Sequence, residues 1–184
     1  RNIIEIKELN QKQKLLLFTK FMGNEGKNSL LSQEKMKKFL ERIPPFPLDL
    51  STTAQYLKAT KITFEEYTER LLHNSKDLNS LLESILSESG DHLKTRYNII
   101  SLSLKKIIQT NQEVKDLLFF ISLLDSQHIP RDLLDKYKGE TLISKFIYHL
   151  KNFSLVSTHT PNLMVPVSTL SLHSSTQEVS LNYL

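Results

Sequence analysis

The sequence predicts a mainly α-helical protein, in which a helical bundle subdomain is followed by a winged-helix subdomain with a small β-hairpin. Two observations support this fold class. Apolar residues recur at helical spacing through most of the chain. From Leu155 onward the pattern changes to short alternating runs rich in β-branched residues, which is typical of paired strands. We expect the bundle over residues 1–90 and the winged helix over residues 91–184.

The chain is expected to enter the fold through a short strand at Ile3–Ile6 and then a helix. Asn10 is a good N-cap, and Gln13 three residues later completes the pattern of a capping box. Gly23 and Gly26 end this helix, because glycine tolerates the backbone that follows a last helical turn.

A proline block separates the next two predicted helices. Ser32 is expected to open a second helix, which Pro44 and Pro45 stop because proline lacks the N–H donor that a helix interior needs. Pro47 is well placed in the first turn of a third helix, where that donor is not used. This helix is expected to stop near Thr60.

Two more amphipathic helices complete the predicted bundle. Thr63 and Glu66 form a second capping-box pattern, and a helix follows it. Another helix ends before Gly90, and its apolar positions are Leu78, Leu81, Leu82, Ile85 and Leu86.

The second subdomain is expected to begin with a helix over Tyr97–Ile108. Asn111 is the predicted N-cap of the next helix, which runs from Gln112 to Leu124. This segment is apolar enough to be the central core helix, with Leu117, Leu118, Phe119, Phe120 and Ile121 in one run.

Two shorter helices follow. Pro130 is expected to begin one that carries Leu133 and Leu134 and is closed by Gly139. The other covers residues 141–151, and its expected inward residues are Leu142, Phe146, Ile147 and Leu150.

The predicted hairpin pairs residues 155–157 with residues 163–172 around a turn at Pro161 and Asn162. Pro166 would confine its strand to a sheet edge, because it cannot donate to the ladder. A final helix is expected from His173 to Leu184.

Composition excludes several classes of function. With no cysteine the chain has neither disulfides nor thiolate metal sites, which fits a cytoplasmic protein. No apolar run approaches 18 residues, so no membrane partner is expected. The net charge of +4 is spread over several helices among carboxylates, so we do not expect nucleic acid as the main partner.

Recognisable catalytic and metal motifs are also missing from the sequence. The four glycines do not form a phosphate-binding loop of the G-x-x-x-x-G-K-[ST] type, and no histidine pair has zinc-site spacing. We therefore expect no metal and no enzyme activity from this chain by itself. Its start, which is neither a methionine nor a signal peptide, suggests a piece of a longer protein.

Several motifs lie in an order that resembles the NB-ARC group of STAND nucleotide switches, most closely the bacterial members that carry tetratricopeptide repeats. Phe46-Pro47-Leu48-Asp49-Leu50 resembles the family's glycine-leucine-proline-leucine block. Leu117–Leu124 with Ile129-Pro130 resembles its winged-helix core. Leu170-Ser171-Leu172-His173 is placed like its methionine-histidine-aspartate motif. The match runs along nearly the whole chain, and each motif is loose.

The resemblance implies a regulatory role in a signal-transduction ATPase. In that family the matching proline contacts adenine and the matching histidine contacts the diphosphate of ADP, which here are Pro47 and His173. ADP or ATP would be bound only in the intact protein, where the partner is the missing nucleotide-binding domain. Release of the closed state would then control oligomerisation, and self-association is left open. Pro45, Asp49 and Ser174 depart from the family pattern.

Two alternatives from other classes remain. The chain could be a DNA-binding winged helix that uses residues 141–151, which offer Lys145, Lys151 and Asn152 beside His149. It could also be a degenerate helical module for protein interaction, in which the nucleotide motifs have decayed.

Overall fold

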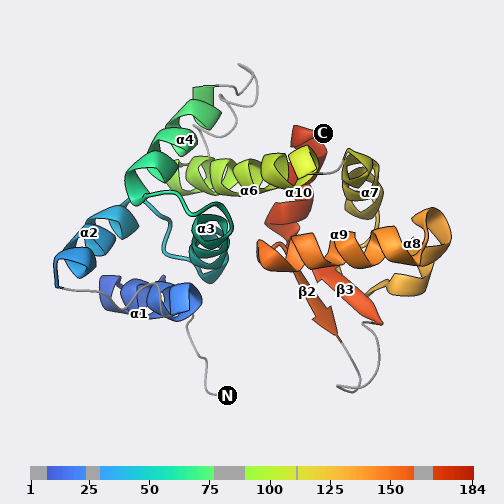
Figure 1. Cartoon of the computed structure of the whole chain (residues 1–184), viewed down its shortest axis with the longest axis horizontal. Coiled ribbons are helices and arrows are strands. Elements are labelled where there is room, and N and C mark those ends of the chain that lie inside the picture. Colours follow the sequence, from blue (N-terminus) through green and yellow to red (C-terminus); the bar gives the residue numbers. More distant parts are fainter. Residues whose placement is uncertain (1–7, 24–29, 77–89, 111, 160–167) are drawn as a thin grey trace. The chain divides into compact units, whose positions relative to one another are not determined.

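The computed structural model describes residues 8–23, 30–76, 90–110, 112–159 and 168–184 (Figure 1). The described chain is mainly helical with a small antiparallel sheet, so the predicted fold class is confirmed. It forms two compact units, Arg1–Arg96 and Tyr97–Leu184, and the division falls inside a helix. The expected strand at Ile3–Ile6, the helix over residues 78–86 and the turn at Pro161 lie outside the described residues, as do Gly26 and Pro166.

The first unit is built from helices. They are α1 (Gln11–Met22), α2 (Leu30–Glu41), α3 (Pro47–Thr60), α4 (Phe64–Lys76) and the first turns of α6 (Asp91–Thr110). Helix α1 packs against both α2 and α3. The sequence predicted that the second helix starts at Ser32. Helix α2 begins two residues earlier, at Leu30, so Ser32 lies inside the helix.

Both predicted capping boxes are confirmed. The Asn10 side chain accepts a hydrogen bond from the Gln13 N–H at 3.0 Å, and the Gln13 side chain accepts one from the Asn10 N–H at 2.9 Å. Thr63 and Glu66 make the same exchange at 3.2 and 2.9 Å. Each box satisfies two backbone donors that a helix start leaves without partners, and so fixes where α1 and α4 begin.

Aromatic rings form the core of the first unit. Phe18 and Tyr67 are fully buried, and Phe39 stacks on Phe64 with 4.6 Å between ring centroids. Phe18 and Tyr67 each lie 5.9 Å from Phe39. The Tyr67 hydroxyl also shares a 3.2 Å hydrogen bond with the buried Thr53 hydroxyl of α3. This cluster therefore ties together α1, α2, α3 and α4.

The second unit has the element order of a winged helix. After α6 come α7 (Glu113–Ser122), β1 (Ile129–Pro130), α8 (Arg131–Lys138), α9 (Glu140–Asn152), β2 (Val156–His159), β3 (Thr169–Leu172) and α10 (Ser174–Tyr183). The strand order is β1-β3-β2, with both pairs antiparallel. The predicted hairpin corresponds to β2 and β3, whereas β1 was not predicted.

Helices α7, α8 and α9 and the sheet all contribute to the core of this unit. Its fully or nearly fully buried apolar residues include Leu117, Leu118 and Ile121 of α7, Leu134 of α8, Ile143, Phe146 and Leu150 of α9, and Leu170 and Leu172 of β3. Gly139 joins α8 to α9 with φ at 84°, a backbone conformation that favours glycine.

Several predicted details of this unit are wrong. Helix α6 is longer at both ends than the expected 97–108, and α7 ends at Ser122 rather than Leu124. Its N-cap is Gln112 without a side-chain bond, and Asn111 lies outside the described residues. On α9 the expected inward residues Phe146, Ile147 and Leu150 are buried, whereas Leu142 is only half-buried and Ile143 is buried in its place.

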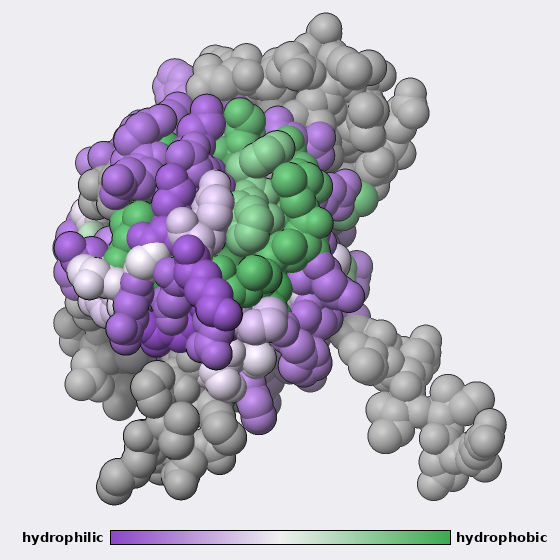
Figure 2. All heavy atoms as spheres, turned by 90° about the vertical axis from the view of Figure 1, so that its right-hand side faces the viewer, coloured by the Kyte–Doolittle hydropathy of each residue, from purple (hydrophilic) through white to green (hydrophobic). Residues whose placement is uncertain are grey.

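Helix α7 supplies core residues, as the sequence predicted, but not every residue of its apolar run faces the core. Phe119 is 49% exposed, and Leu123, Leu133 and Tyr137 are exposed as well, so these side chains add to the apolar surface of the second unit. Figure 2 shows a hydrophobic patch on one face of the molecule. Phe120 stacks on Tyr137 with 4.4 Å between ring centroids. Helix α7 is apolar on more than one side, so it supplies both the core and this surface area.

In the part of the chain that the structure describes, no helix is both long and apolar enough to cross a membrane.

Candidate functional site

Pro47 lies at the first helical position of α3 and is exposed, as the sequence predicted for a proline-led helix. The preceding residue, Phe46, is the N-cap and is extended, with φ at −123° and ψ at 144°. The N–H of Phe46 donates to the Pro44 carbonyl at 2.9 Å, which closes a tight turn before the helix. None of residues 43–50 has a positive φ, so Pro45 fits its position without the backbone freedom of glycine.

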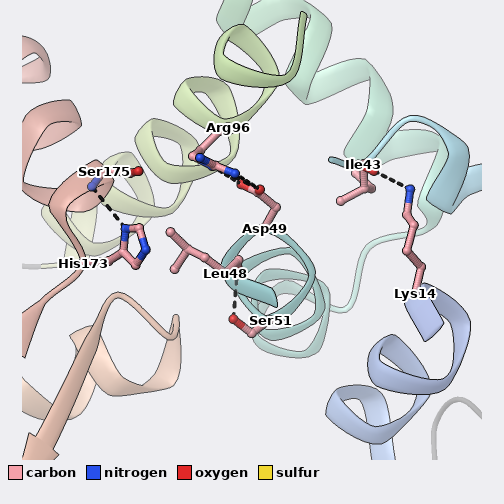
Figure 3. A network of polar contacts seen from close by, with 8 residues as sticks. All are labelled: Lys14, Ile43, Leu48, Asp49, Ser51, Arg96, His173 and Ser175. Carbon is pink, nitrogen blue, oxygen red and sulfur yellow. Dashed lines mark hydrogen bonds and ion pairs between the residues drawn. The ribbon is translucent and has the colours of Figure 1, made fainter. Parts of the chain in front are cut away.

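A buried ion pair anchors the first turn of α3. The Arg96 guanidinium of α6 donates to both carboxylate oxygens of Asp49, at distances of 2.9 and 3.1 Å, and Asp49 has no exposed surface (Figure 3). The guanidinium carbon also lies 4.5 Å from the centre of the Phe46 ring, and the His92 ring meets that ring edge-on at 6.3 Å. These contacts fix the orientation of the backbone around Pro47 from both sides.

Asp49 is one of the residues that depart from the pattern described above, and its carboxylate is stabilised in two ways in the structure. A carboxylate in the first turn of a helix is favoured by the helix dipole, and here it also binds Arg96. The role of Arg96 could not be predicted from the sequence, because the pair joins residues 47 positions apart.

A buried lysine holds the other end of the proline block. Lys14 of α1 is 6% exposed and donates to the Leu40 carbonyl and, at 2.6 Å, to the Ile43 carbonyl (Figure 3). Both carbonyls lie at the C-terminal end of α2, where helix carbonyls need external donors. Burial lowers the pKa of the Lys14 amine, and the nearby Glu41 carboxylate opposes this effect. Nothing in the sequence distinguishes Lys14 from an exposed helix lysine.

His173 is the N-cap of α10 and is exposed. Its Nδ1 accepts a hydrogen bond from the Ser175 N–H at 3.2 Å, which Figure 3 marks with a dashed line. An imidazole that accepts at Nδ1 while neutral carries its proton on Nε2. The side chain therefore caps the helix with one nitrogen and has a donor on the other.

The strand and helix on either side of His173 are held in place by polar contacts to the end of α7. The Leu172 N–H donates to the Ser126 carbonyl at 2.8 Å. The Gln177 amide of α10 donates to the carbonyls of Ser122 and Leu124, at 3.0 and 2.6 Å. The junction that carries His173 is thus a rigid part of the winged-helix unit.

Pro47 belongs to the first unit and His173 to the second. The structure brings Pro47 together with Asp49 and Arg96, and His173 together with Ser175. Within the described ranges, no three histidine, aspartate or glutamate side chains gather in a way that could hold a metal ion.

The exposed side of α9 is polar and partly basic. Ser144, Lys145, Tyr148, Lys151 and Asn152 are exposed, and Tyr148 is 62% exposed. His149 is half-buried, so it contributes less to this surface than the sequence suggested. Glu140 in the first turn of the helix adds a negative charge nearby.

Comparison with known proteins does not assign this chain to a family. No protein-family model matches this chain, and no curated protein does. The family resemblance therefore rests on the motifs themselves, and nucleotide contact at Pro47 and His173 stays a prediction.

Proposed function

We propose that this chain is the regulatory lid and winged-helix portion of an NB-ARC-like signal-transduction ATPase. In the intact protein it helps to hold ADP and the closed state, and it controls oligomerisation. The nucleotide-binding domain of the same protein is its partner, and ADP and ATP bind only when that domain is present. The intact protein is then a slow ATPase switch, and this chain by itself is not an enzyme.

One observation carries the proposal: a winged-helix element order that ends in an exposed histidine at the N-cap of the next helix. The helix dipole favours a negatively charged phosphate at this end of α10. The Nε2 donor of His173 adds a hydrogen bond in the same place.

The contact at Pro47 has a different chemistry. An exposed proline ring at the start of α3 offers a rigid apolar surface to a nucleobase. The buried pair of Asp49 and Arg96 and the ring of Phe46 keep this surface in one orientation.

Replacing His173 with aspartate in the intact protein is expected to lower the ADP retained on purification by about tenfold or more. The loss of a charge-assisted hydrogen bond to phosphate costs about 1.5–3 kcal/mol, and the new carboxylate repels the diphosphate. Aspartate is a good N-cap, so α10 should remain folded. The nucleotide is measured by chromatography after the protein is denatured.

A matched control separates this effect from a general change of charge. His159→Asp makes the same change on an exposed histidine of β2 and should leave ADP retention unchanged. Full retention by the His173→Asp protein, or the absence of ADP from the wild-type protein, would contradict the proposal and favour a degenerate interaction module.

DNA binding through α9 is the second candidate, because its exposed face carries two lysines, a tyrosine and an asparagine. If this candidate holds, Lys145→Glu together with Lys151→Glu should abolish a gel shift with duplex DNA, and wild-type binding should strengthen steeply as salt falls. Lys105→Glu and Lys136→Glu, on other helices, are the control for charge. A shift that survives the α9 changes would exclude this surface.

A further inference from the structure

A groove of about 340 Å³ runs between α2 and α4 in the first unit. Its floor is apolar and is formed by Phe39, Phe64 and Leu72. Phe39 and Phe64 are stacked on each other, so the floor is rigid, whereas Leu72 is 58% exposed. An exposed leucine beside stacked aromatic rings is a surface that an apolar side chain can cover.

The two edges of the groove carry opposite charges. Lys35 and Lys38 lie on α2, Arg42 directly follows its last residue, and all three are exposed. Glu65 and Glu69 lie one turn apart on α4 and are also exposed. Among the described residues no ion pair joins these two edges, so each edge keeps its charges for an external partner.

We propose that this groove binds an amphipathic helix of a partner protein, with its apolar side on the floor and with one acidic and one basic flank. The acidic flank pairs with the α2 edge and the basic flank with the α4 edge. An apolar stripe flanked by charges is how helices commonly fill grooves and select partners. The inference goes beyond the nucleotide-switch proposal and does not depend on it.

The charges on the two edges of the groove indicate which class of partner it can bind. Nucleic acid and anionic lipid present negative charge only, and Glu65 and Glu69 would repel both. A partner of uniform positive charge would be repelled by the α2 edge. Only a surface with both signs on either side of an apolar stripe matches both edges, and charge complementarity of this kind mainly sets specificity.

The test uses the whole chain and three labelled helical peptides of about 18 residues, a length at which isolated helices form. All three share the same leucine stripe. One has a glutamate flank and a lysine flank, one has two glutamate flanks, and one has two lysine flanks. Fluorescence anisotropy should show the mixed peptide binding at least about tenfold more tightly than the others, because several surface pairs change sign together.

Two variants of the chain test the groove itself. Leu72→Asp should weaken binding of the mixed peptide about tenfold or more, since a carboxylate replaces the exposed apolar contact. Lys35→Glu together with Lys38→Glu should shift the preference to the peptide with two lysine flanks. Leu123→Asp, an exposed leucine of the second unit, is the control and should change nothing.

Three results would overturn the proposal. They are equal binding of all three peptides, unchanged binding by the Leu72→Asp chain, and no binding at all. Concentration-dependent dimerisation that Leu72→Asp removes, without peptide binding, would instead assign the groove to a second copy of the chain. Circular dichroism of each variant confirms that a loss of binding is not a loss of fold.

Discussion

Replacing Arg96 with leucine is expected to lower the free energy of unfolding by about 3–5 kcal/mol. The change leaves the Asp49 carboxylate, which has no exposed surface, without the guanidinium that donates to both its oxygens. A buried charge that loses its partner keeps the cost of desolvation and loses the attraction that offset it. Urea unfolding at pH 7, followed by circular dichroism, measures the difference.

The control for this prediction removes both charges. The double variant Asp49→Leu with Arg96→Leu should recover most of the loss, because apolar residues of similar size often replace a buried ion pair at little cost. Arg96→Lys should fall between the two, since lysine keeps the charge but not the two parallel hydrogen bonds. A loss below about 1 kcal/mol for Arg96→Leu would mean that the pair behaves like an exposed one.

The same variant bears on the proposed nucleotide contact. Arg96 also covers the Phe46 ring, which precedes Pro47. We therefore expect hydrogen exchange at the first turns of α3 to accelerate in the Arg96→Leu chain more than at the end of α3. Local loosening around Pro47 would identify the ion pair as the element that positions this proline.

The features that the sequence predicted well are local. The capping boxes at Asn10 and Thr63 depend on residues three positions apart, so they can be recognised without knowing the fold. Pro47 at the first position of α3 follows from the same kind of rule. The order of helices and the hairpin followed from hydrophobic periodicity, which is also a local signal.

The features that could not be predicted from the sequence depend on contacts between residues far apart along the chain. Strand β1 has two residues and exists because Ile129 and Pro130 pair with β3, about 40 residues later. Lys14 looked like any exposed helix lysine, and its burial follows from how α1 meets the end of α2. The Asp49–Arg96 pair has the same origin. Such contacts have no sequence period that could reveal them.

The candidate site contains one feature that could be predicted from the sequence and one that could not. The place of His173 at the start of the last helix could be predicted, because the strand pattern ends just before it. Its use of Nδ1 as a helix cap could not, since histidine is not among the usual capping residues. The exposure of Phe119 could not be predicted, because a run of five apolar residues does not show which of them face the core.

Raising the pH above about 10 is expected to destabilise the first unit through Tyr67. Burial raises the pKa of its phenol far above the ordinary value, and the hydrogen bond with Thr53 only partly offsets this effect. The folded chain therefore keeps the proton at a pH where the unfolded chain releases it. The stabilising contribution is complete below about pH 10 and falls by up to about 1.4 kcal/mol per pH unit above it.

Tyr67→Phe separates this effect from other alkaline changes. At pH 8 the variant should be less stable by about 1–3 kcal/mol, because the buried Thr53 hydroxyl loses its partner. Between pH 10 and 12 its stability should fall less steeply than that of the wild type, so the two curves converge. Burial also raises the pKa of Tyr97, but this residue is unchanged in both chains and cancels in the difference.

The control is Tyr148→Phe, because that ring is 62% exposed and should leave both the stability and its pH dependence nearly unchanged. Urea unfolding at pH 8, 10 and 11 gives the pH dependence of the free energy of unfolding for the wild type, Tyr67→Phe and Tyr148→Phe. The nearby Asp49 carboxylate also raises the Tyr67 pKa, so the Asp49→Leu/Arg96→Leu chain should show a slightly shallower alkaline loss. Parallel curves for the wild type and Tyr67→Phe would contradict the burial of this phenol, and with it the packing of α4 on α3.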